Sequence, residues 1–184
     1  MARIVETTFA LIQRRGSLEP SMRDILAETG LSTQAFYRYF TSKDELMLAL
    51  LDEGRRRLLR TLERRMGQVT DPAAQVRAWV EGVMAQATNA AAAARTRPWV
   101  SSEQRLAELF PEEQQSSVDL LVAPLRAPIS RLGAPSGPDA AAYAALCIYR
   151  LTFATLRAHL VGRHQPRPEE TEALVSFCLR GAGA

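Results

Sequence analysis

The sequence has few cysteines and no long hydrophobic run. Its two cysteines, Cys147 and Cys178, are 31 positions apart and belong to no CxxC or Cys/His pattern, so reduced thiols are expected and metal sites are not. The apolar stretches are far shorter than the roughly 18 residues of a membrane span, and acidic Glu6 lies where a signal peptide would be basic and then apolar. We therefore expect a cytoplasmic protein with no metal, cofactor or membrane contact.

The sequence also lacks the residue combinations of an enzyme. Catalysis requires a nucleophile beside a base, paired carboxylates or a phosphate-binding loop. The glycines do not cluster, and the acidic residues mostly have the positions of helix caps and surface charges. His159 and His164 come late in the chain and are five positions apart, a spacing that does not require a shared helix face. The sequence therefore predicts no catalytic residue and no histidine metal site.

The excess positive charge lies in the first third of the chain. Residues 1–66 hold 12 lysines and arginines against 9 aspartates and glutamates, whereas residues 67–184 hold 11 of each. Lys43 is the only lysine. A basic end of this kind is typical of a protein that meets a polyanion such as DNA. The run Arg55 to Arg57 is predicted to be a solvated surface, because three consecutive residues of a helix point in different directions.

Strand patterns are nearly absent, and apolar residues recur at spacings of three and four, which predicts an all-α fold. Ser21 with Asp24, and Ser42 with Glu45, have the spacing of capping boxes. The first third is predicted to hold four helices, at Arg3 to Arg15 with a stop at Gly16, Ser21 to Gly30, Ser32 through Phe40, and Ser42 to Met66. Five more are predicted, at Ala73 to Ala94, Glu103 to Phe110, from Glu112 with a break or strong kink at Pro124 and Pro128, Asp139 to Gly162, and Pro168 to Arg180.

The most informative segment runs from Ser21 to Leu46. It holds two short capped helices joined by a glycine turn, so the second helix crosses the first and exposes its N-terminal half, which fits the major groove of DNA. The segment resembles the TetR family of transcriptional repressors at Ile25, Gly30, Leu31, Ser32, Tyr37, Phe40, Lys43 and Leu46. The resemblance implies a helix-turn-helix DNA-binding domain at 1–46, joined by a long fourth helix to a helical ligand-binding and dimerisation domain at 47–184. Leu26, Gln34 and Tyr39 depart from the residues most common in the family.

Helix geometry assigns roles within this segment. Gln34 can bond bidentately to adenine, and its neighbours can touch a thymine methyl, so the predicted base contacts are Thr33, Gln34 and Ala35. The predicted phosphate contacts are Ser21, Arg23, Tyr37, Tyr39 and Lys43. For Ser21 and Arg23, helix capping and a surface ion pair are the alternatives.

In the family that the chain resembles, the C-terminal helices enclose a pocket and the last two long helices pair with those of a second copy. The residues expected to line an apolar pocket here are Trp79, Met84, Trp99, Phe110, Tyr143 and Tyr149, with Gln86, Asn89 or Arg150 as polar anchors. The residues expected at the dimer interface are Cys147, Leu151, Ala154, Ala158, Leu174, Phe177 and Cys178.

The resemblance therefore predicts a homodimeric regulator of transcription. We expect a repressor that binds a palindromic double-stranded DNA operator and is released from it by a small, largely apolar effector. The alternative is an architectural or partner-scaffold protein that uses the same helix-turn-helix but has no small-molecule inducer.

Overall fold

The computed structural model describes residues 1–15, 20–133 and 139–183. Over these ranges the secondary structure is helical without strands, which confirms the predicted all-α fold. The helices are α1 (Ala2–Arg15), α2 (Met22–Thr29), α3 (Thr33–Tyr37), α4 (Lys43–Met66), α5 (Pro72–Met84), α6 (Ala90–Leu109), α7 (Pro111–Arg131), α8 (Ala140–Gly162) and α9 (Pro168–Gly181). None of these helices is both long enough and apolar enough to cross a bilayer. The predicted stop at Gly16 lies outside the described residues.

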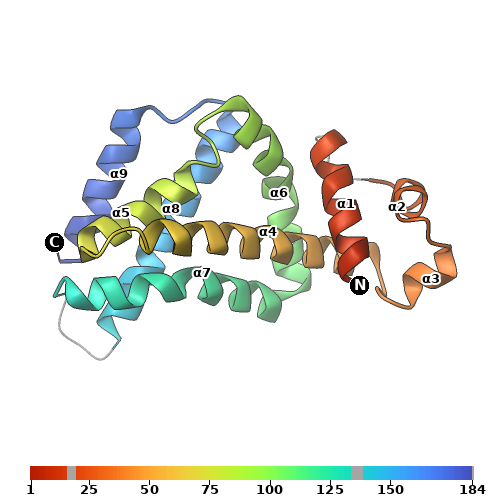
Figure 1. Cartoon of the computed structure of the whole chain (residues 1–184), viewed down its shortest axis with the longest axis horizontal. Helices are drawn as coiled ribbons and strands as arrows, with labels where there is room; N and C mark the ends of the chain where they lie inside the picture. Colours follow the sequence, from red (N-terminus) through yellow and green to blue (C-terminus); the bar gives the residue numbers. More distant parts are fainter. Residues whose placement is uncertain (16–19, 134–138, 184) are drawn as a thin grey trace.

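Helix α4 runs along the middle of the molecule and joins its two parts (Figure 1). At one end, α1, α2 and α3 pack around the first two turns of α4, and we call this part the head. At the other end α5 and α7 pack against the rest of α4, α8 packs against α5 and α7, and α9 packs against α5 and α8; we call this part the body. Helix α6 stands between them and contacts α4, α7 and α8.

The head has its own apolar core. Its buried side chains come from the predicted apolar face of α1, from both helices of the helix-turn-helix and from the start of α4: Ile4, Phe9, Ile12, Ile25, Phe36, Phe40, Leu46 and Leu50. Phe36 is completely buried, which fixes the short helix α3 against the head although α3 has only 5 residues. Leu106 of α6 belongs to the same core, so the packing of the head extends well past residue 46.

The caps of the first helices agree with the sequence patterns in part. Ser21 and Asp24 form the complete predicted capping box at the start of α2. The Ser21 hydroxyl and the Arg15 guanidinium, which lies 2.7 Å from Asp24, stabilise the carboxylate and lower the pKa of Asp24 to about 2. At α4 the Ser42 hydroxyl accepts from the Glu45 N–H at 3.1 Å, but the Glu45 carboxylate accepts from the N–H of Thr41 rather than from that of Ser42. The second box is therefore only half formed.

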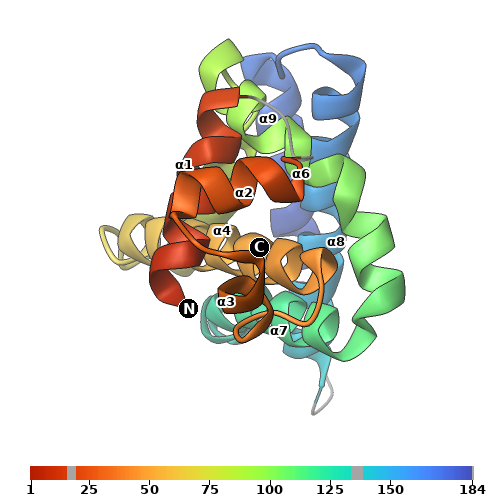
Figure 2. The same ribbon diagram turned by 90° about the vertical axis from the view of Figure 1, so that its right-hand side faces the viewer.

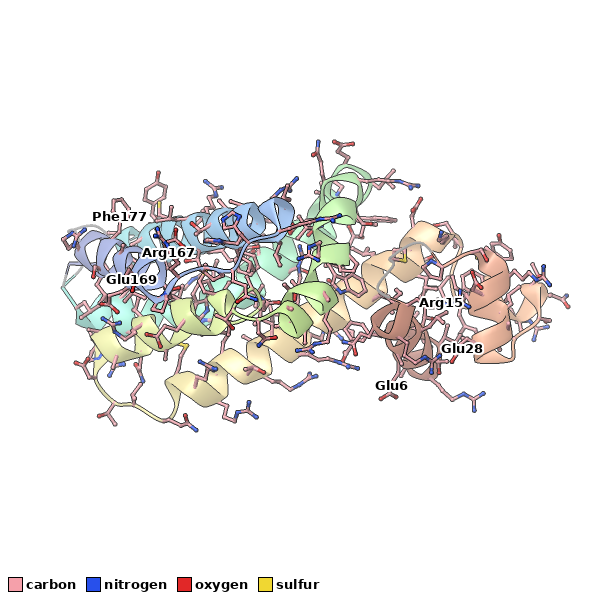
Figure 3. All side chains as sticks on the ribbon, turned by 90° about the horizontal axis from the view of Figure 1, so that it is seen from above. Glu6, Arg15, Glu28, Arg167, Glu169 and Phe177 are labelled. Atoms are coloured by element: carbon pink, nitrogen blue, oxygen red, sulfur yellow. The ribbon has the colours of Figure 1, made fainter. Side chains whose placement is uncertain are left out.

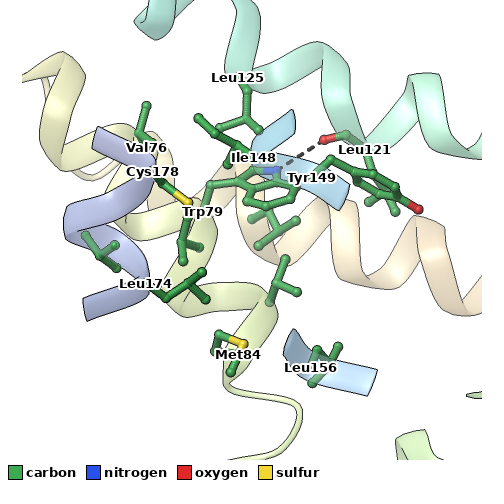
Figure 4. Close-up of a cluster of buried hydrophobic side chains, with 14 of the residues drawn as sticks. Val76, Trp79, Met84, Leu121, Leu125, Ile148, Tyr149, Leu156, Leu174 and Cys178 are labelled. Carbon is green, nitrogen blue, oxygen red and sulfur yellow. Dashed lines mark hydrogen bonds between the residues drawn. The ribbon is translucent and has the colours of Figure 1, made fainter. Parts of the chain in front are cut away.

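The body is built around Trp79 of α5, which is completely buried (Figure 4). Its indole N–H donates to the backbone carbonyl of Leu121 on α7 at 3.2 Å, so the one polar atom of the ring is satisfied. Its ring lies 6.5 Å from that of Tyr149 and 6.3 Å from that of Phe153, both on α8. Burial raises the pKa of Tyr149 to about 12.

The predicted helix from Ala73 to Ala94 is wrong, because the chain ends one helix at Met84 and begins another at Ala90. Asn89 is in an extended conformation, and its side chain accepts from the N–H of Ala92 at 2.8 Å. Asparagine is a strong N-cap, so α6 begins directly after Asn89 and the alanine run belongs to α6 rather than to the preceding helix. Asn89 is therefore a helix cap rather than a ligand anchor.

The prolines do not end their helices, so of the break or strong kink predicted at Pro124 and Pro128 the break is wrong. Helix α6 continues through Pro98, and α7 continues through Pro124 and Pro128. A proline inside a helix costs about 3 kcal/mol because it lacks an N–H and crowds the preceding turn. In α7 the same turns bury Leu125 and Ile129 in the core of the body, and this tertiary packing outweighs the local cost.

Helices α4 and α5 approach each other closely at Gly82. A β-carbon at Gly82 would lie 2.5 Å from Cδ2 of Leu62, which is completely buried. At Gly54 of α4, a β-carbon would lie 3.6 Å from the ring of Phe9, an ordinary contact distance. The two glycines are therefore a matched pair, of which only Gly82 is required by packing.

We expect Gly82→Ala to lower the free energy of unfolding by on the order of 1 kcal/mol, because overpacking at Leu62 exceeds the gain in helix propensity. Gly54→Ala, the control, should raise it by up to about 1 kcal/mol, because alanine favours the helix and meets no clash. Urea unfolding at one protein concentration measures both. Equal stability of the two variants would contradict the close approach.

Candidate functional site

Helix α3 lies at the outer end of the head and faces the viewer in Figure 2. Ser32 caps it by accepting from the N–H of Ala35 at 3.2 Å. In its first turn Thr33 and Gln34 are exposed and Ala35 is half-buried. The helix therefore presents to solvent the first-turn residues from which base contacts were predicted, while Phe36 holds it from behind.

The predicted phosphate-contacting residues come from α2, from α3 and the turn after it, and from α4. Tyr37, Tyr39 and Arg23 are exposed, and Lys43 is the half-buried first residue of α4. Arg23 makes no ion pair with any described residue, so its predicted alternative of a surface ion pair is not seen in this part of the chain. The Ser21 hydroxyl donates to the Asp24 carboxylate at 2.6 Å and is occupied by capping.

A partly open cavity of about 360 Å³ lies where the head meets the body. Its walls are helices α1, α4, α5, α6 and α8. Most of its lining is apolar, and the large apolar side chains are Phe9, Leu51, Leu58, Trp99, Val100, Phe153, Leu156 and Leu160. A concave apolar surface of this volume with a few polar groups is typical of a small-molecule site.

One wall of the cavity belongs to the head itself. Phe9 and Gln13 of α1 line it together with Trp99 of α6. The rings of Phe9 and Trp99 are stacked, with centroids 5.4 Å apart and planes inclined by 19°. The Arg57 guanidinium lies 4.4 Å from the centroid of the same Phe9 ring. The contact between α1 and α6 therefore forms part of the cavity wall.

Arg55 of α4 is buried and joins α4 to α6 and α7. Its guanidinium donates to the side-chain oxygen of Gln114 and, at 3.0 Å, to the carboxylate of Glu103. The Gln114 amide donates to the Glu103 backbone carbonyl at 3.4 Å, and the Ser117 hydroxyl donates to Asp52 at 2.6 Å. The predicted solvated surface at Arg55 to Arg57 is therefore wrong for Arg55, because its buried charge is paired inside the protein.

Six residues, five aromatics and Met84, were predicted to line a pocket. Of these, only Trp99 lines this cavity. Trp79, Met84 and Tyr149 are buried in the core of the body, and Phe110 packs against the core of the head. Tyr143 is exposed on α8. Apolar residues at helical spacing do not reveal which of them face a space, so the sequence did not separate lining from core.

The polar residues of the cavity were predicted only in part. Gln86 lines it, as expected of a polar anchor, whereas Arg150 is exposed on α8 and is not part of the lining. Sequence reasoning missed Gln13, Arg95 and Arg157. Nothing in their local sequence marks them, because the cavity brings together helices that are far apart along the chain.

A second concave surface, of about 470 Å³, lies along α8 and α9. Tyr143, Cys147 and Phe177 line it, and 66% of Tyr143 and 62% of Phe177 are exposed. Figure 3 shows Phe177 at the far end of the molecule from Arg15 and Glu28 of the head. Exposed aromatic side chains that share one face are typical of a protein interface.

The residues predicted for the dimer interface divide into two groups. Cys147, Ala154, Ala158 and Phe177 are exposed, and Leu151 is half-buried. Leu174 is buried in the core of its own chain, whereas Cys178 is buried but borders the concave surface along α8 and α9. Burial also raises the pKa of the Cys178 thiol to about 11, which leaves it protonated at neutral pH.

The structure brings together the two histidines for which the sequence required no common face. The ring centroids of His159 and His164 are 4.5 Å apart at the end of α8, and burial lowers the pKa of His159. Among the described residues, no three His, Cys, Asp or Glu side chains lie close enough together to hold a metal ion.

The comparisons with known proteins concern the helix-turn-helix and the fold. Residues 4–50 match the family described as bacterial regulatory proteins, tetR family. No curated protein sequence matches the chain. The matched residues 4–50 include α1 without its first two residues, the whole of α2 and α3, and the first third of α4.

Solved structures of the same fold cover nearly the whole chain. RolR, solved with the ligand resorcinol, has a TM-score of 0.69 at 13% identity, over 97% of this chain and 85% of that one. FadR from Bacillus subtilis, solved with stearoyl-CoA, has a TM-score of 0.67 at 15% identity, over 98% of both chains. A TetR transcription regulator from Haloarcula marismortui has a TM-score of 0.69 at 19% identity, over 98% of this chain and 95% of that one.

The matched helix-turn-helix and the shared fold point to the same group of proteins. Its members are DNA-binding regulators rather than enzymes, as the sequence predicted. Residues 4–50 therefore have the DNA-binding segment of bacterial regulatory proteins of the tetR family, and the chain as a whole has the fold of these solved structures.

Proposed function

We propose that this chain is a homodimeric repressor, which binds a near-palindromic operator and releases it when a small, largely apolar molecule enters the cavity between head and body. One observation carries the proposal: the cavity is bounded by Phe9 and Gln13 of the head as well as by helices of the body. A ligand there changes the contacts of α1 directly. RolR and FadR, which share the fold, were solved with small-molecule ligands, and this supports the proposal.

The head supplies the DNA contacts in this proposal. Helix α3 lies in the major groove, and the exposed Thr33 and Gln34, with Ala35, contact base edges. Tyr37, Tyr39, Lys43 and Arg23 bind phosphates and set the register of the helix, whereas the Ser21 hydroxyl serves as the cap of α2. The two recognition helices of the dimer then read half-sites about 34 to 36 Å apart, or a multiple of that distance.

The route from ligand to DNA is a change in the separation of the two heads. Helix α4 connects the Lys43 end to the body without interruption, and Gly54 does not break it. The stacked rings of Phe9 and Trp99 make a second, non-covalent connection beside it. A coupling of about 1 to 3 kcal/mol between the sites changes operator affinity roughly 5- to 150-fold.

The alternative, an architectural protein without an inducer, is not favoured. Such a protein needs the head and the dimer but has no use for a cavity. A concave and mostly apolar space of about 360 Å³ with a few polar groups is instead typical of a small-molecule site.

The dimer forms through α8 and α9 in this proposal. The exposed side chains of Tyr143, Phe177 and Val161 lie on these two helices, and small residues between them, Ala154 and Ala158, allow close approach of a second copy. In a two-fold interface each of these residues meets the same face of the partner.

We expect Lys43→Ala to weaken binding to operator and to unrelated DNA alike and to lower the salt slope by about one unit, because a phosphate contact carries no base information. Gln34→Ala should instead relax preference at one base pair, at a cost of on the order of 1 to 3 kcal/mol. Arg64→Ala, at the far end of α4, is the matched control and should change neither. Fluorescence anisotropy over a salt series measures all three, and an equal loss on every sequence for Gln34→Ala would contradict the base contact.

We expect Phe177→Arg to convert the dimer to monomers at micromolar concentration, because the interface would then bury two like charges. Leu109→Arg, which changes another exposed apolar residue on α6, should remain dimeric. Light scattering distinguishes the two states. A dimeric Phe177→Arg protein would place the interface elsewhere.

We expect operator DNA and an apolar probe to weaken each other's binding by the same factor, because coupling between binding sites is reciprocal. N-phenyl-1-naphthylamine, which becomes fluorescent in apolar sites, is titrated into free dimer and into dimer bound to an operator selected from random duplexes. Ala92→Phe fills the cavity and should remove probe binding but keep operator binding, whereas Ala91→Phe, on the exposed side of α6, should keep both. Equal probe affinities in the two titrations would leave a binding site that is not a switch.

A further inference from the structure

The side chains that line the cavity carry more positive than negative charge. Four arginines and one glutamate line it. Arg55 is paired with Glu103 at 3.0 Å, and Arg57 is paired with Glu53 at 2.7 Å. The second pair, through the hydrogen bond from Arg57, also lowers the pKa of Glu53.

Arg95 of α6 and Arg157 of α8 are the other two arginines. Both are exposed, and neither has a side-chain hydrogen bond or an ion pair with any residue that the structure describes. A guanidinium group stays charged at any physiological pH, and it is weakly hydrated and suited to bidentate pairing with carboxylate, sulfonate or phosphate. The cavity therefore carries two positive charges without a partner in the described chain.

Arg95 and Arg157 lie on neighbouring parts of α6 and α8. Arg95 and Glu103 are eight residues apart on α6, which corresponds to about 12 Å along the helix. The start of α6 and the end of α8 are held together by a hydrogen bond from Arg97 Nε to the Leu160 carbonyl at 3.0 Å, and they lie side by side at the top of Figure 1. Between Arg95 and Glu103 the wall includes the apolar side chains of Trp99 and Val100.

We infer that the effector is an amphipathic anion, with an apolar body against the wall near Trp99 and one acidic group that pairs with Arg95 and Arg157. This inference rests on the proposed function, in which the cavity is the effector site. It narrows the effector from a largely apolar molecule to one with a negative charge at one end. The apolar body supplies burial, and the acidic group fixes the orientation of the molecule.

Two probes that share one aromatic body test the inference. 8-Anilinonaphthalene-1-sulfonate carries a sulfonate, and N-phenyl-1-naphthylamine is its uncharged counterpart. In the wild-type dimer the anion should bind about tenfold or more tightly than the neutral probe, and Arg95→Gln/Arg157→Gln should remove this advantage, as expected when charge-assisted hydrogen bonds are lost. Binding of the neutral probe should change less than about twofold in the same variant.

The controls separate this site from general attraction to arginine. Arg126→Gln changes an exposed arginine on α7 outside the cavity, and it should leave both affinities unchanged. Ala92→Phe should remove both probes. Equal losses for the two probes in the double variant, a loss of the anion in Arg126→Gln, or no binding of either probe would overturn the inference.

The operator titrations distinguish failure of the inferred anion site from failure of the proposed ligand switch. If the neutral probe releases the operator as well as the anion does, and the double variant is unchanged, the switch stands and the anion site does not. If the anion binds with the expected dependence on Arg95 and Arg157 but leaves operator affinity unchanged, the anion site stands and the switch does not.

Discussion

The structure depends on one constraint: α4 contributes to two hydrophobic cores at once. Leu46 and Leu50 near its start are buried in the head, and Leu62 and Met66 near its end are buried in the body. A helix is stiff over this length, so moving either core moves the other. The stacking of Trp99 on Phe9 adds a second connection, because α6 packs on the head and also contacts α7 and α8 of the body. Head and body therefore differ in function but do not pack independently.

The polar network around Arg55 fixes how α4, α6 and α7 fit together. Hydrophobic packing alone tolerates sliding of helices, whereas a buried guanidinium requires its partners at defined positions. Glu103 and Gln114 meet that requirement from two other helices. Arg55 and Glu103 of this network also line the cavity, so its lining combines a buried ion pair with apolar side chains and with Arg95 and Arg157.

The sequence predicted most of what depends on neighbours along the chain, apart from the Asn89 cap and the second half of the Ser42 capping box. The all-α fold, the capping box of Ser21 with Asp24 and the buried faces of α1 and α4 all follow from spacing and caps. The helix-turn-helix could be recognised for the same reason, since its motif lies within a continuous segment whose turn and caps fix its geometry. The exposed first turn of α3 follows from that motif, although its contacts with DNA remain predictions.

Only the tertiary structure decided what depends on helices far apart in the sequence. Local propensity placed a break at the prolines of α7 and none near Asn89, and packing of Leu125 and Ile129 together with the Asn89 cap reversed both. The sequence predicted the wrong lining for the cavity, because an apolar side chain such as Trp79 has the same helical spacing whether it faces the core or a cavity. Arg55 became a buried partner of Glu103, and Arg95 and Arg157 came to line one cavity, because a charge acquires its role from the residues that surround it in space.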